Sequence, residues 1–114
     1  MTSDAASERP SDPVAPDPDV AAALAKLPDW HVDSTGIAAT FETGTFARGV
    51  ALVDAIGVLA DSADHHPDIE LTYPRVTVRL VTHDAGMRVT TRDTALAADI
   101  SVAALSLKRG SVTP

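Results

Sequence analysis

The stretch that decides the fold runs from residue 46 to residue 80 and reads FARGVALVDAIGVLADSADHHPDIELTYPRVTVRL. Its first half repeats apolar side chains at helical spacing, which predicts an amphipathic helix over about residues 46–63. Thr45 stands before this helix as a capping residue, and Pro67 prevents the helix from continuing. The positions on the apolar face are Phe46, Val50, Val53, Gly57 and Ala60.

The second half of this stretch changes to a strand repeat. Residues 69–73 and residues 76–82 alternate apolar and polar side chains, as half-buried strands do. Pro74-Arg75 between them is suited to a tight connection. The second half therefore predicts a β-hairpin that directly follows a helix.

The flanking sequence extends this order on both sides. Residues 20–27 carry apolar side chains at helical spacing and Pro28 stops them, which predicts a short first helix. Residues 29–42 alternate around a turn sequence and predict a first hairpin. Thr90 can cap a third helix, with Asp93 three residues later as its partner in a capping box.

The resulting order is helix, two strands, helix, two strands, helix. Two half-buried hairpins predict an α+β fold, a four-stranded antiparallel sheet with three helices on one face. An open sheet of four strands leaves two edges that need covering or pairing. We therefore expect two copies of the chain to join edge to edge as a homodimer.

The length and composition predict one folded domain and a tail. With 114 residues, the chain has room for one modest core, which we place at residues 17–110. The first 19 residues carry five acidic side chains against one arginine, and half of the eight prolines. Such a composition buries little, so residues 1–16 are predicted to be a disordered, solubilising tail, with a docking peptide as the alternative.

The composition also excludes several classes of function. The net charge of −7 disfavours nucleic-acid binding, which depends on lysine and arginine. No apolar run approaches the ~20 residues of a membrane span, and the N-terminus does not resemble a signal peptide. There is no cysteine, hence no disulfide and no thiolate metal site. These features predict a cytoplasmic protein that binds neither membrane nor nucleic acid.

Three of the four histidines, His65, His66 and His83, lie within 19 residues of one another. Histidine exchanges protons near neutral pH, and carboxylates accompany these three at Asp61 and Asp93. Because both histidine segments adjoin paired strands, they can meet at one end of the sheet. We interpret the cluster as an acid–base site. A zinc site is the alternative, and each residue taken alone is also compatible with packing, capping or surface exposure.

The spacing of these residues resembles a known signature. Asp61, three residues, His65-His66-Pro67, five residues, Tyr73, nine residues, His83, nine residues and Asp93 resemble the motif of the pterin-4a-carbinolamine dehydratase family. The resemblance extends over about residues 18–107. Asp61 stands where the family often has glutamate, and residues 85–87 replace a loop richer in glycine.

The resemblance implies a role for each residue of the motif. His65 and His83 would transfer protons, and His66 would position the substrate, with Tyr73 also at the substrate site. The carboxylates would support these imidazoles. Asp61 would support His65 from one helical turn earlier, and Asp93 would orient His83 or hold its loop.

The resemblance also implies a reaction and partners. Family members share the fold predicted above and form dimers or tetramers. They remove water from 4a-hydroxytetrahydropterin and release quinonoid dihydropterin, which recycles the cofactor of aromatic amino acid hydroxylases. The enzyme would need no metal or organic cofactor, and a pterin-dependent hydroxylase is a possible partner. The alternative is a non-catalytic member that acts as a dimerising or assembly partner protein.

Overall fold

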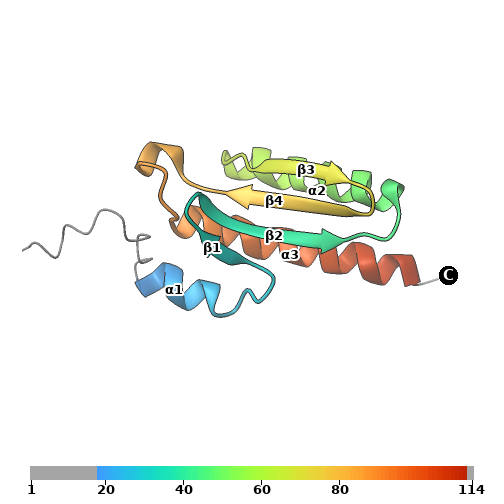
Figure 1. Ribbon diagram of the computed structural model, residues 1–114, viewed down its shortest axis with the longest axis horizontal. Helices are drawn as coiled ribbons and strands as arrows, with labels where there is room; N and C mark the ends of the chain where they lie inside the picture. The colour runs from blue at the N-terminus through green and yellow to red at the C-terminus, as the bar shows by residue number, and fades with distance from the viewer. Residues whose placement is uncertain (1–17, 113–114) are drawn as a thin grey trace, which may run out of the picture.

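A computed structural model describes residues 18–112, with only the backbone of Asp84 and of residues 109–112 (Figure 1). The predicted tail, residues 1–16, lies outside the described residues. The helices and strands follow one another in the predicted order α-β-β-α-β-β-α, which confirms the fold class. They are α1 (Pro18–Leu24), β1 (His31–Asp33), β2 (Gly36–Glu42), α2 (Phe46–Ala63), β3 (Asp68–Thr72), β4 (Arg75–Leu80), the 3-10 turn η2 (His83–Ala85) and α3 (Thr91–Val112).

The four strands form one antiparallel sheet in the order β1-β2-β4-β3. The first hairpin therefore contributes an outer and an inner strand, and so does the second. Pairs such as Ile37 with Leu80 and Phe41 with Val76 join the two hairpins through β2 and β4. Figure 1 shows α2 and α3 behind the sheet, with α1 alongside α3. Within the described residues, no helix is long and apolar enough to cross a membrane.

The core lies between the sheet and the two long helices. The alternating residues of β2 and β4 place one set of side chains under α2 and α3, and full burial of each large aliphatic side chain contributes about 1.5–3 kcal/mol. The other face of the sheet carries polar side chains, with Thr40 and Thr77 hydrogen-bonded across β2 and β4 at 3.1 Å. The fully buried aliphatic residues include Ile37, Val76, Val78, Leu80, Leu52, Ile56, Leu96 and Ile100.

The turn between β1 and β2 requires glycine at position 36. Gly36 has φ of +138°, and a Cβ atom built on it would lie 2.3 Å from the carbonyl oxygen of Leu80. Gly36→Ala is therefore expected to lower the free energy of unfolding by about 2 kcal/mol or more, because the methyl group would displace backbone. Urea denaturation measures this effect. Gly57→Ala is the matched control, since a Cβ atom there meets nothing within 4 Å. Equal stabilities of the two variants would contradict the argument.

An ion pair on the open face of the sheet ties the outer strand β1 to β4. The carboxylate of Asp33 accepts hydrogen bonds from Thr35 through one oxygen and from Arg79 Nη1, at 2.6 Å, through the other. The hydrogen bond from the Arg79 guanidinium, together with those from Thr35, holds the pKa of Asp33 well below its usual range. Because the pKa of Asp33 is lower in the folded than in the unfolded state, its ion pair stabilises the fold fully at pH values above the unfolded pKa of about 4. This stabilisation decreases as the pH falls from there toward the folded pKa.

We expect Asp33→Asn to lower the melting temperature at pH 7 and to have a smaller effect near pH 3. The Asp33 side chain is 36% exposed, so solvent screening limits the contribution to about 1 kcal/mol or less. Thermal denaturation of both proteins across this pH range measures the difference. If the difference in melting temperature between the two proteins did not change with pH, the ion pair of Asp33 with Arg79 would not stabilise the fold.

Candidate active site

The end of α2 separates the two neighbouring histidines. Asp64, the C-cap residue, has left-handed backbone with φ of 50°, and its N–H bonds to the carbonyls of Ala60 and Asp61. The N–H of His65 also bonds to the Ala60 carbonyl, at 3.1 Å. The helix is therefore closed one residue before the histidines. His65 is buried, with 6% exposure, whereas His66 is exposed, as expected for neighbours in extended chain.

The buried histidine is paired with a buried carboxylate. Nε2 of His65 lies 2.6 Å from Oδ1 of Asp93, which is fully buried. The other oxygen of Asp93 accepts hydrogen bonds from Thr82 Oγ1, at 2.7 Å, and from the N–H of Thr90, at 2.8 Å. The bond from Thr90 is the half of the predicted capping box that Asp93 supplies, whereas Thr90 Oγ1 accepts from the N–H of Arg92 and not from that of Asp93. Asp93 thus caps the helix and orients an imidazole at once.

The pairing of carboxylates with histidines differs from the prediction. Asp61 lies 3.0 Å from Nε2 of His66, not beside His65, and both side chains are exposed. Asp93 supports His65 and not His83. The cause is the left-handed turn at Asp64, which brings His66 back alongside the last turn of α2 and directs His65 inward.

His83 lies next to the buried pair along the chain. It begins η2 directly after Thr82, the residue that bonds to Asp93, and its side chain is exposed. The structure thus brings His83 to the same end of the sheet as the other two histidines, because β4 ends where β3 begins.

Tyr73 is not brought to the histidines within one chain. It follows β3 at the turn into β4, and its side chain is 65% exposed. Five strand residues separate it from Pro67, a distance of about 20 Å at the usual rise of a strand. The predicted contact between Tyr73 and the substrate stays a prediction.

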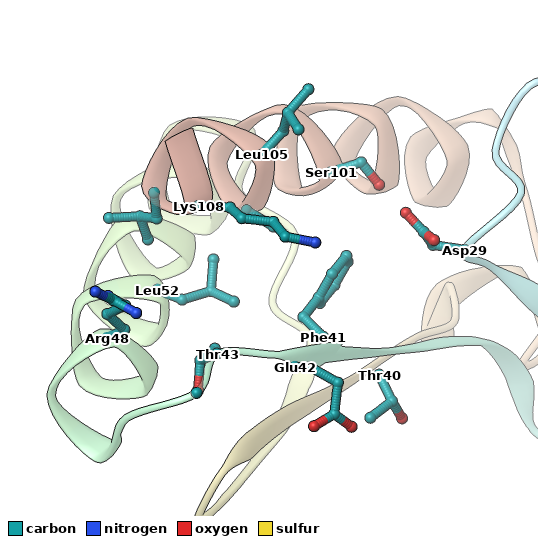
Figure 2. A pocket seen from close by; sticks show the side chains of 13 residues that line it. Asp29, Thr40, Phe41, Glu42, Thr43, Arg48, Leu52, Ser101, Leu105 and Lys108 are labelled. Atoms are coloured by element: carbon teal, nitrogen blue, oxygen red, sulfur yellow. The ribbon is translucent and has the colours of Figure 1, made fainter. Parts of the chain in front are cut away.

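A hollow lies at the other end of α2 from the histidines, and Figure 2 shows the side chains that line it. It measures about 610 Å³ and lies between β2, the start of α2 and the last turns of α3, with Phe41, Leu52 and Lys108 among its lining residues. None of its lining residues is a histidine. Because α2 is about 27 Å long, the hollow and the histidines are well separated. At the histidine site, His66 and His83 are exposed beside the buried pair of His65 and Asp93.

The described side chains do not form a metal site. Among residues 18–112 with described side chains, no three histidine, aspartate or glutamate side chains gather as a metal site would require. The opposite directions of His65 and His66 explain part of this, since the two rings cannot share one ion.

Sequence reasoning missed the two threonine hydroxyls at the site. Thr82 and Thr90 lie 2.7 Å apart through their Oγ1 atoms, and Thr82 is 2% exposed. The available signal was the place of Thr82 directly before His83, at the end of a predicted strand. Thr90 was recognised only as a helix cap.

Fold and site together define a small α+β protein with a buried histidine–aspartate pair beside two exposed histidines. The chain belongs to the pterin 4 alpha carbinolamine dehydratase family, whose model matches residues 13–103. This membership agrees with the resemblance inferred from the motif between Asp61 and Asp93.

Known relatives of similar length support the assignment to this family. A protein of Chloroflexus aurantiacus is 44% identical over 82 residues, which are 72% of this chain and 87% of the relative. A protein of Nocardia farcinica is 42% identical over 84 residues, covering 74% of this chain and 87% of the relative. Both carry the provisional name of a pterin-4-alpha-carbinolamine dehydratase.

A solved structure shares the fold. The crystal structure of a transcriptional coactivator/pterin dehydratase from Brucella melitensis matches with a TM-score of 0.71 and 27% identity. The match covers 82% of this chain and 99% of the Brucella chain.

Proposed function

We propose that this protein dehydrates 4a-hydroxytetrahydropterin to quinonoid dihydropterin. The observation that carries the proposal is the buried His65–Asp93 pair beside two exposed histidines, in a member of this family. In the reaction the bond between C4a and the hydroxyl oxygen breaks, and the hydroxyl leaves as water after taking up a proton. The adjacent ring nitrogen loses its proton and forms a double bond to C4a. A base and an acid of near-neutral pKa meet both demands.

The contacts of the imidazoles suggest how the roles divide. When Asp93 accepts the Nε2 proton of His65, the neutral ring keeps Nδ1 as its proton acceptor, which suits a base. His83 is exposed beside this pair and serves as the acid in its protonated form. His66, held by Asp61, positions the substrate.

A second candidate function follows from the Brucella relative, whose title also names a transcriptional coactivator. In that case the chain would be a non-catalytic, dimerising assembly partner. Such a role does not require a buried histidine paired with a carboxylate, so we favour the enzyme. Self-association into a dimer or tetramer, and a pterin-dependent hydroxylase as partner, remain predictions for either function.

The direct test is the dehydration of chemically prepared 4a-hydroxytetrahydropterin, followed by ultraviolet absorbance. We expect the purified protein to accelerate the loss of substrate in proportion to its concentration, with and without a chelator. Since proton transfer by histidine requires no metal, the two rates should agree. Absence of acceleration would favour the assembly partner, and a rate abolished by chelation would overturn the proposed mechanism.

A further inference from the structure

The residue that links the buried pair to the loop of His83 is Thr82. Its hydroxyl lies 2.7 Å from Oδ2 of Asp93 and 2.7 Å from Oγ1 of Thr90. Its backbone closes the loop that carries His83, since its N–H bonds to the carbonyl of Arg88 and its own carbonyl accepts from Met87. One residue thus contacts both parts of the histidine site.

The directions of these hydrogen bonds follow from the chemistry of the groups. An ionised carboxylate only accepts, so the single hydroxyl proton of Thr82 is donated to Asp93. Thr90 must then donate its proton to Thr82, while its own oxygen accepts from the N–H of Arg92, 3.3 Å away. The donors therefore point in one direction, from the backbone of α3 to Oδ2 of Asp93.

The consequence for the carboxylate is a fixed orientation. Oδ2 is held by two donors, Thr82 Oγ1 and the N–H of Thr90, so Oδ1 faces Nε2 of His65. Rotation of the carboxylate would break both bonds inside the protein, where unpaired polar groups are costly. A carboxylate held in this way selects the tautomer of His65 that carries its proton on Nε2.

We propose that Thr82 is a positioning residue for the proton-transfer pair. Its hydroxyl holds Asp93 so that His65 keeps Nδ1 as the proton acceptor. The effect on turnover rests on the proposed function, whereas the effect on the His65 ring does not.

The cap of α3 does not account for this hydroxyl. The capping bonds of α3 run from the N–H of Thr90 to Asp93 Oδ2 and from the N–H of Arg92 to Thr90 Oγ1, without Thr82. Thr82 approaches from the end of β4, where valine would fill the same volume and suits a strand at least as well. Burying a hydroxyl costs free energy unless it is bonded, so the hydrogen bond to Asp93 is what the threonine adds at this position.

The test compares Thr82→Val with Thr82→Ser in the full-length protein. Thr82→Val is expected to lower kcat about tenfold or more with KM nearly unchanged, because one hydrogen bond to a charged group is lost. The downfield proton signal of His65 Nε2–H, assigned by NMR with the His65→Gln variant, should broaden or vanish. Thr82→Ser keeps the hydroxyl and should therefore keep both kcat and the Nε2–H signal near their wild-type values. Thr77→Val, on the open face of β4, is the matched control and should change neither.

The outcomes separate the two proposals. If Thr82→Val keeps both kcat and the Nε2–H signal, Thr82 does not position the pair and the inference is overturned. If the wild-type protein does not dehydrate the pterin, the proposed function fails, yet loss of the signal in the valine variant still supports the positioning role. Should Thr82→Val fail to fold, the comparison of Thr82→Ala with Thr82→Ser by the same signal decides.

Discussion

His83→Ala is expected to lower kcat by about 10²–10⁴-fold, the usual contribution of a positioned acid or base. The side chain is exposed at the start of η2, so its removal should leave the melting temperature nearly unchanged. Rate measurements with 4a-hydroxytetrahydropterin, combined with thermal denaturation, separate the two effects. His31→Ala is the matched control, because His31 is also an exposed histidine and lies on the outer strand β1. Near-full activity of His83→Ala would remove His83 from the proton-transfer step.

Asp93→Ala is expected to have the largest effect on stability, a loss of about 3 kcal/mol in the free energy of unfolding. The substitution leaves two buried donors, on His65 and Thr82, and the half-buried N–H of Thr90 without their acceptor. It should also lower kcat, since the His65 ring loses its orientation. Urea denaturation measures the stability, with Asp61→Ala as the control. The carboxylate of Asp61 is exposed and, in the described contacts, bonded to exposed His66, so its loss should cost less than about 1 kcal/mol. Similar losses of unfolding free energy in Asp93→Ala and Asp61→Ala would show that burial of the His65–Asp93 pair does not add to the stability of the fold.

Because the His65–Asp93 pair is buried, His65→Ala cannot test the catalytic role of His65 separately from its role in stability. An exposed histidine in a cleft could be removed without harm to the fold, but the ring of His65 is hydrogen-bonded to a carboxylate inside the protein. Its loss leaves Asp93 charged and partly unpaired, which lowers stability as well as activity. His65→Gln keeps a donor near Asp93 and is the better variant for testing the role of His65 as the base.

The regular elements were predictable from sequence because their periodicity is strong. The helix expected over residues 46–63 is α2 with the same bounds, since Thr45 caps one end and Pro67 follows the other. The strand expected to reach Thr82 ends at Leu80, because the N–H of Thr82 bonds to Arg88 across the following turn.

The site was predictable in composition but not in pairing. The motif brought together the three histidines and both carboxylates, yet which carboxylate meets which imidazole depends on the left-handed backbone at Asp64. A non-glycine residue in that conformation is uncommon and has no clear signal in sequence. Tyr73 was assigned to the site from the motif alone, because spacing along the chain does not show which end of a hairpin faces the histidines.

The division between a buried and an exposed histidine has a consequence for insertions and deletions. Loops at the ends of helices usually tolerate changes of length. Between Asp64 and Asp68, however, adding or removing one residue would exchange the directions of His65 and His66 relative to β3. A residue other than His65 would then lie beside Asp93. The connection between α2 and β3 would have to shift by one residue to restore the His65–Asp93 pair. The number of residues in this short connection is therefore as constrained as their identity.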